Sequence, residues 1–164
     1  MYPNQQNNYN IPEPFGIRDI RITNVVIPLH TLSEKLRFNQ ISTHHENNLK
    51  FPLNSDEMSN LIETILLKIP MPIFYFDVSN PFTWSSINGI KRLITINEFI
   101  VQNKFPLSSM KILNNLDGLY YSQLPDNYKR ILYDTQIITY QIEAQTPIQL
   151  RELIFKKIRD MNDN

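Results

Sequence analysis

The feature that most constrains the fold is an amphipathic helix that stops at a proline and is followed at once by a strand. Ser55 is a suitable N-cap, and Asp56 and Glu57 follow in the first turn, where the helix dipole favours negative charge. Apolar residues then recur at helical spacing and form one broad face: Met58, Leu61, Ile62, Ile65, Leu66 and Ile69. Pro70 ends the helix, and Ile73–Phe76 has the length and composition of a buried strand.

The same reasoning predicts alternating strands and helices along the rest of the chain. β-branched and alternating apolar residues favour strands at 17–27, 83–87 and 136–143. Helical spacing favours helices at 29–38, 88–102, 126–133 and from 147 onward. A turn is expected at Asp117-Gly118, and residues 107–116 give no clear pattern. These elements predict an α+β fold.

Composition limits the classes of protein that fit. The chain has 164 residues, of which 41% are hydrophobic, and contains no cysteine, which excludes disulfides and thiolate metal sites. Its formal net charge is zero, so no overall field attracts nucleic acid or an anionic membrane. The N-terminus lacks a signal peptide, and no run reaches the ~20 apolar residues of a membrane-spanning helix. We expect a cytoplasmic or other intracellular protein without a membrane partner.

The first 14 residues differ from the rest of the chain. They are rich in Asn and Gln and contain three prolines, so they cannot bury enough apolar surface to order themselves. We expect a polar tail over 1–14 that contacts a protein partner, and a single domain over 15–164.

Residue usage also carries information about the genome. Ile and Asn are frequent, whereas the chain has only 3 glycines and Ala144 as its one alanine. AT-rich codons encode the first group and GC-rich codons the second. An AT-rich genome is therefore expected, such as that of a large DNA virus, a phage or an AT-rich bacterium.

The segment Leu61–Phe76, with the sequence LIETILLKIPMPIFYF, resembles the helix–strand segment of the DGQQR-type domain. This ParB/sulfiredoxin-like domain forms the N-terminal part of GmrSD-type restriction enzymes. Ile87–Thr95, INGIKRLIT, stands where the family has its D-G-Q-Q-R motif. Later landmarks keep the family's order at Leu116–Gly118, 124–125, 136–142 and 147–162. The resemblance covers about residues 25–162 and implies a ParB/sulfiredoxin-like small mixed sheet flanked by helices.

Active members of the family bind and hydrolyse nucleoside triphosphates with the D-G-Q-Q-R loop. At such a strand-to-helix turn, glycine admits close backbone approach, and the helix N-terminus and arginine bind phosphate. The aspartate can hold a metal ion or polarise water. The resemblance therefore implies a phosphate site at the matching turn of this chain.

The loop of this chain departs from the family pattern. Gly89 and Arg92 keep the family's residue types, but Asn88 replaces the aspartate, and Ile90 and Lys91 replace the two glutamines. The family's upstream Gln-Arg pair and tryptophan have no counterpart near Asn48, Leu49 and Leu53.

Two interpretations of the loop follow. The resemblance implies that Asn88, Gly89, Lys91 and Arg92 are candidate phosphate or nucleotide ligands, without a carboxylate for turnover. The alternative is a helix start capped by Asn88 and flanked by solvated basic residues.

Three further groups of residues are candidate functional sites, and each also has a purely structural interpretation. Glu63 is a possible site carboxylate because the family keeps glutamate there, but a structural carboxylate bonded to backbone is the preferred interpretation. Lys156, Lys157 and Arg159 form either a nucleic-acid patch or a set of cations that complement a helix C-terminus. Residues 44–46, His-His-Glu, fit a polar loop better than a metal site, so no metal is expected.

Three functions are compatible with the sequence. The leading hypothesis is a non-catalytic interaction or structural module on a degenerate DGQQR-type scaffold, without a cofactor. The first alternative is a residual domain that binds or hydrolyses a nucleoside triphosphate with magnesium through Lys91 and Arg92. The second alternative is a nucleic-acid-binding module that uses the basic helix start and the C-terminal cluster.

Overall fold

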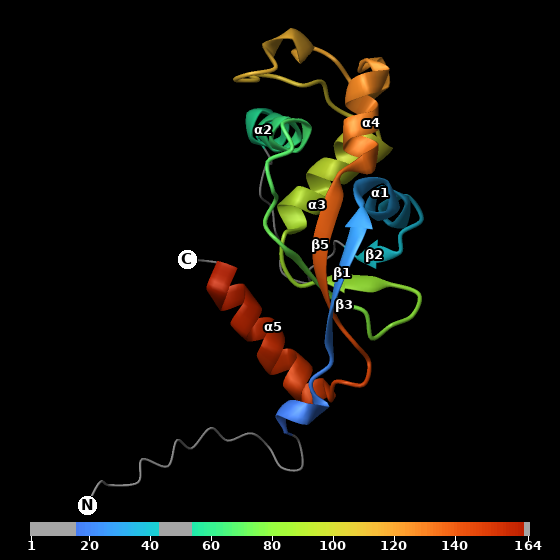
Figure 1. Cartoon of the computed structure of the whole chain (residues 1–164), viewed down its shortest axis with the longest axis vertical. Coiled ribbons are helices and arrows are strands. Elements are labelled where there is room, and N and C mark those ends of the chain that lie inside the picture. The colour runs from blue at the N-terminus through green and yellow to red at the C-terminus, as the bar shows by residue number, and fades with distance from the viewer. Residues whose placement is uncertain (1–15, 43–53, 163–164) are drawn as a thin grey trace, which may run out of the picture.

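The computed structural model describes residues 16–42 and 54–162, which form a mixed sheet with helices on both faces (Figure 1). The strands are β1 Ile22–Pro28, β2 Ile41–Ser42, β3 Phe74–Asp77, β4 Trp84–Ser86 and β5 Gln136–Ile142. The α-helices are α1 Leu29–Arg37, α2 Ser55–Leu66, α3 Ile90–Ile96, α4 Asp126–Asp134 and α5 Ile148–Asn162. Short helical turns lie at Ile17–Asp19, Asn97–Val101, Asn114–Leu116 and Tyr121–Gln123. The predicted α+β class and the mixed sheet flanked by helices are confirmed.

The sheet has the strand order β1-β5-β3-β4-β2. β3 is central and pairs parallel with β5 and antiparallel with β4. β1 pairs antiparallel with β5 in an unbroken register that runs from Ile22↔Ile142 to Pro28↔Gln136. β2 pairs parallel with β4, so β1 and β2 form the two edges.

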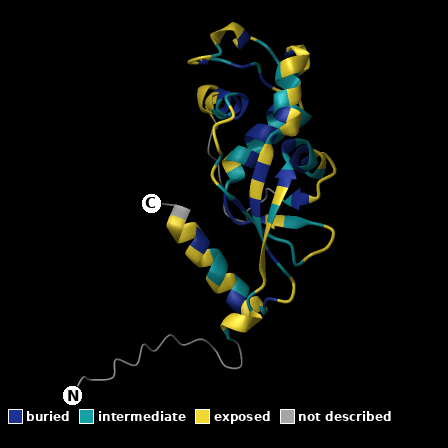
Figure 2. Cartoon of the chain, viewed as in Figure 1, coloured by how far each residue is buried: buried dark blue, intermediate teal, exposed yellow. Residues whose placement is uncertain are grey.

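The main core lies on the face of the sheet that α1 to α4 cover. Alternate strand residues are buried in it, among them Phe74, Phe76 and Ile137, and they pack with the apolar stripes of the helices. Figure 2 shows buried segments in the helices and the strands of this part of the molecule. The opposite face carries a smaller cluster, in which Ile158 of α5 packs with Ile87 and Ile142. Thus α5 covers the sheet at the end where β4 leads into α3.

The start of β1 differs from the prediction because residues 17–19 form a 3-10 turn instead of strand. The Asp19 carboxylate accepts a 2.6 Å hydrogen bond from the Gly16 backbone N–H, which folds this segment back on itself. Thr146, which is fully buried, then accepts from the Arg21 N–H at 2.8 Å and donates to the Arg21 carbonyl. The extended strand begins only after this anchor, at Ile22.

Both ends of α2 also differ from the prediction. The N-cap is Asn54, whose side-chain oxygen accepts from the Asp56 N–H at 2.9 Å, and Ser55 is the first helical residue. The helix ends at Leu66, before the proline, because Lys68 adopts a left-handed φ of 59°. The Lys68 N–H then bonds the Ile65 carbonyl, and the Ile69 N–H bonds the Thr64 carbonyl, which closes a Schellman motif.

The predicted helix 88–102 is shorter and divided. α3 covers Ile90–Ile96, and a π-helical turn, Asn97–Val101, continues it. Among the described residues, no helix has both the length and the apolar content needed to span a bilayer.

Candidate functional site

Asn88 joins the end of β4 to the central strand. The residue is 8% exposed, and its side-chain oxygen accepts from the Tyr75 N–H at 2.8 Å while its Nδ2 donates to the Ile73 carbonyl at 3.1 Å. The Ile87 N–H donates to the Tyr75 carbonyl at 2.9 Å, so the carboxamide prolongs the pairing of this segment with β3 as a peptide group would. The Ser86 hydroxyl donates to the Asn88 carbonyl at 2.6 Å. The expected role of Asn88 as a helix cap is therefore wrong.

Gly89 is the N-cap of α3, and no side chain caps that helix. Its φ of 74° is left-handed, and an added Cβ would lie 2.6 Å from Nη2 of Arg92 and 2.9 Å from Cε1 of Phe74. Both the backbone conformation and the lack of space require glycine here. The close approach that glycine permits is thus occupied by a side chain of the same molecule.

Arg92 points back toward the connection that precedes β3. Its guanidinium donates to the Pro72 carbonyl and, at 3.4 Å, to the Ile73 carbonyl, and it lies 4.1 Å above the centre of the Phe74 ring. Burial lowers the pKa of Arg92 to about 10, so the group stays charged at neutral pH. The guanidinium, which the resemblance expects to bind a phosphate, therefore donates to backbone carbonyls. Lys91, the neighbouring candidate, has an exposed side chain.

Glu63 is a buried carboxylate that binds backbone. It is 3% exposed and accepts three N–H groups, from Lys111 at 3.0 Å and from Ile112 and Leu113 at 2.7 Å each. Burial alone would raise the pKa of Glu63, but the three donors and the charge of Lys111 outweigh it and hold the pKa below its ordinary value of 4.5. The geometry agrees with the preferred structural interpretation of this residue.

The segment that Glu63 holds is attached to α2 at a second place. The Ser108 N–H donates to the Ser59 hydroxyl, and the Ser108 hydroxyl donates to the Asp56 carboxylate, both at 2.9 Å. Asp56, Ser59 and Glu63 share one side of α2 because their spacing of three and four residues follows the helix period. The sequence carries this stripe as polar residues at helical spacing, which apolar spacing alone does not reveal.

The basic candidates of α5 lie near the turn without forming part of it. Lys156, Lys157 and Arg159 are exposed, while Ile158 between them is buried against Ile87. The C-terminal half of α5 therefore lies beside the residue that precedes Asn88. The cations themselves face outward from that contact.

Several candidates fall outside the part of the chain that the structure describes. These are the tail over 1–14, residues 44–46, and the positions Asn48, Leu49 and Leu53. Within residues 16–42 and 54–162, no group of three or more His, Asp or Glu side chains is placed to hold a metal ion.

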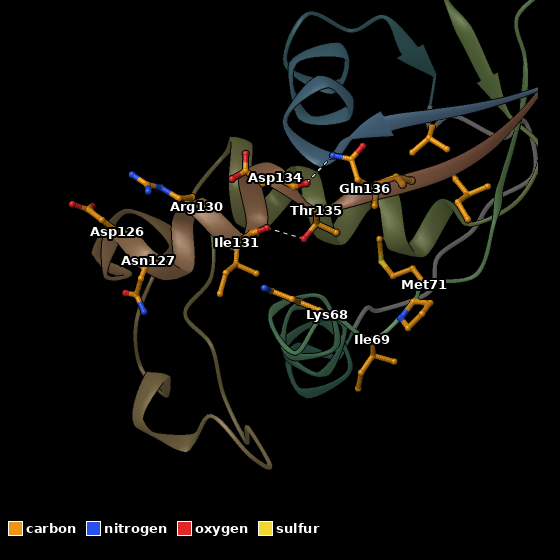
Figure 3. Close-up of a pocket in the computed structure, with 14 residues that line it drawn as sticks. Lys68, Ile69, Met71, Asp126, Asn127, Arg130, Ile131, Asp134, Thr135 and Gln136 are labelled. Carbon is orange, nitrogen blue, oxygen red and sulfur yellow. Dashed lines mark hydrogen bonds between the residues drawn. The ribbon is translucent and has the colours of Figure 1, made fainter.

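A groove that the sequence did not reveal lies between α4, the connection from α2 to β3, and the sheet (Figure 3). Its cavity volume is about 1090 Å³. Its apolar lining includes Val26, Ile69, Met71 and Ile138, of which Val26 is 51%, Ile69 52% and Ile138 44% exposed. These residues come from three separate segments, so only the folded chain brings them together.

The walls of the groove are charged. Asp126, Arg130 and Asp134 recur every four residues along one side of α4. Lys68 lies on the opposite wall and extends toward α4 (Figure 3). An apolar lining with a rim of both charge signs is typical of a surface that binds a partner or an organic ligand.

Comparisons of the chain with family models, with curated proteins and with solved structures give no match. The fold and the turn define an α+β protein in which the turn at Asn88–Arg92 is filled by the protein's own side chains.

Replacing Asn88 with aspartate tests the role of its carboxamide. An aspartate keeps the acceptor for the Tyr75 N–H but has no N–H for the Ile73 carbonyl, so we expect Asn88→Asp to lower the free energy of unfolding by about 1–3 kcal/mol. Asn80→Asp is the matched control, because the Asn80 side chain only accepts, from the Phe82 N–H at 2.9 Å. Urea denaturation of both variants measures the effect. Equal losses in the two variants would contradict the proposed role.

The lowered pKa of Glu63 predicts a pH-dependent contribution to stability. Its contribution is complete above the ordinary pKa of 4.5 and is lost as the pH falls through the lower pKa of the folded state. We expect Glu63→Gln to lower the free energy of unfolding by about 1.5–3 kcal/mol at pH 7, because bonds to a charged acceptor are lost. This deficit should shrink below pH 4.5 in urea denaturation.

Glu57→Gln provides the control for this series, since Glu57 lies exposed in the first turn of the same helix. A pH-independent deficit for Glu63→Gln, or an equal deficit for Glu57→Gln, would show that the buried charge is not the cause.

Proposed function

We propose that this chain is a non-catalytic interaction module on a degenerate DGQQR-type, ParB/sulfiredoxin-like scaffold. The observation that carries the proposal is the engagement of Asn88 and Arg92 with the backbone of β3 and the connection before it. Both residues stand where the resemblance expects the ligands of a triphosphate. Each makes two hydrogen bonds to backbone groups within the protein.

Phosphoryl chemistry needs groups that this turn lacks. A metal-bound triphosphate requires negative charge to hold the cation and free donors to stabilise the phosphate oxygens. Asn88 is uncharged, and both terminal nitrogens of Arg92 donate to the Pro72 and Ile73 carbonyls. Moving Arg92 outward would cost its contact with the Phe74 ring and its hydrogen bond to the Pro72 carbonyl, whereas the Ile73 carbonyl would keep the donor from Asn88.

The groove between α4 and residues 68–71 gives the module a surface for interaction. Exposed apolar residues line it, and its rim carries two positive and two negative side chains: Lys68, Arg130, Asp126 and Asp134. Such a surface favours a partner with an apolar face and mixed charge. A nucleic acid fits it poorly, because that partner would require excess positive charge.

An assay of nucleoside triphosphate hydrolysis with magnesium tests the absence of catalysis. We expect no phosphate release above the protein-free blank and no rise in melting temperature with millimolar nucleotide, since a ligand of the folded state would stabilise it. Lys91→Ala is the diagnostic variant because its side chain is exposed and its removal leaves the Asn88 and Arg92 contacts intact. Turnover or stabilisation that disappears in Lys91→Ala would refute the proposal.

A further inference from the structure

The edge strand β1 presents backbone groups that no described strand pairs. The Glu143 N–H donates to the Arg21 carbonyl at 3.0 Å, and the Leu29 N–H donates to the Thr135 carbonyl at 2.7 Å, so odd-numbered residues face β5. The alternation of an antiparallel pair then directs the N–H and C=O groups of Ile22, Asn24 and Val26 outward. β1 has seven residues, whereas β2 at the other edge has two within the described part of the chain.

β1 lacks the devices that normally protect an edge strand. Residues 22–28, with the sequence ITNVVIP, contain no charged side chain, and the register with β5 shows no bulge. Ile22 is 41% and Val26 51% exposed, and Thr23 and Asn24 are exposed as well. Pro28 removes an outward N–H only at the last position, which leaves Ile22–Val26 open to pairing.

We propose that β1 pairs antiparallel with β1 of a second copy of this chain, which joins two sheets into one across a twofold axis at Asn24. In this register, Ile22 faces Val26 of the second copy, so each exposed apolar side chain of the edge meets an apolar partner. The two Asn24 carboxamides face each other, and each can donate and accept. The outward backbone groups of Ile22, Asn24 and Val26 then form ladder hydrogen bonds.

Charge favours this arrangement over a parallel one. Arg21 of one copy lies opposite Ile27 of the second copy, so the two Arg21 side chains are separated by roughly 20 Å along the paired strands. Parallel pairing would set Arg21 beside Arg21. The formal net charge of zero adds no overall repulsion between copies.

The second copy also completes the groove. Val26 lines one side of the groove and belongs to the edge strand β1, so the lining stops at the edge of the sheet. In the dimer, Ile22 of the second copy lies beside Val26 and extends the apolar lining past the edge. The pairing rests on the sheet edge and is independent of whether the Gly89 turn binds nucleotide.

The test is the molar mass of the full chain in solution, measured by sedimentation equilibrium from about 1 to 200 µM. We expect the wild-type mass to rise to that of a dimer within this range. Asn24→Pro removes an outward N–H that makes no bond to β5, so the fold is retained while the dimer dissociation constant rises at least about tenfold. Val26→Lys places a charge opposite Ile22 of the second copy and has the same effect.

Asn24→Thr is the matched control, because it keeps the backbone N–H and a side chain suited to a strand, and it should dimerise like the wild type. Circular dichroism and thermal melting confirm that each variant is folded. A wild-type protein that stays monomeric over the whole range would overturn the inference. A dimer that Asn24→Pro and Val26→Lys leave unchanged would also overturn it, by placing the interface elsewhere.

Discussion

The pairing of the Asn88 carboxamide with the backbone of β3 is the interaction on which the rest of the site depends. It fixes the chain where β4 gives way to α3, and it holds Gly89 in the left-handed conformation that starts the helix. That helix start brings Arg92 over Phe74 and onto the Pro72 and Ile73 carbonyls. The central strand, the turn and the connection from α2 are therefore one hydrogen-bonded unit.

This unit fills the turn at Asn88–Arg92 with the protein's own side chains. Glycine at such a turn allows something to approach the backbone closely, and here the guanidinium of Arg92 takes that space. A carboxylate at position 88 would accept from Tyr75 but would repel the Ile73 carbonyl, which the amide of Asn88 instead satisfies. An asparagine at position 88 therefore stabilises this arrangement of the turn better than an aspartate would.

The sequence predicted those parts of the fold that depend on local periodicity. α1, α2, α4, α5 and the strands β3, β4 and β5 lie within a few residues of their expected positions, because apolar spacing or β-branched runs mark them. The end of α2 was misplaced because the left-handed residue is Lys68, and only glycine or asparagine would have indicated a stop there. The 3-10 turn at Ile17–Asp19 depends on a side-chain bond to Gly16, which spacing does not reveal.

The site was less predictable because its contacts are distant in sequence. Asn before glycine suggested a helix cap, yet the partners of Asn88 lie 13 and 15 residues earlier. Glu63 binds N–H groups 48 to 50 residues later, and the groove combines β1, α4 and the residues that follow α2. The residue type determines whether a side chain can donate or accept a hydrogen bond, and the tertiary structure determines which group it binds.

The most direct test of a self-filled turn is an NMR titration of the isotopically labelled protein with magnesium and a non-hydrolysable triphosphate analogue. The amide resonances of Gly89, Ile90 and Lys91 and the guanidinium resonances of Arg92 report on the turn itself. We expect these resonances to stay in place at millimolar ligand, with the Tyr75 amide proton still protected by Asn88. Saturable shifts at Gly89 and Arg92, together with loss of that protection, would contradict it.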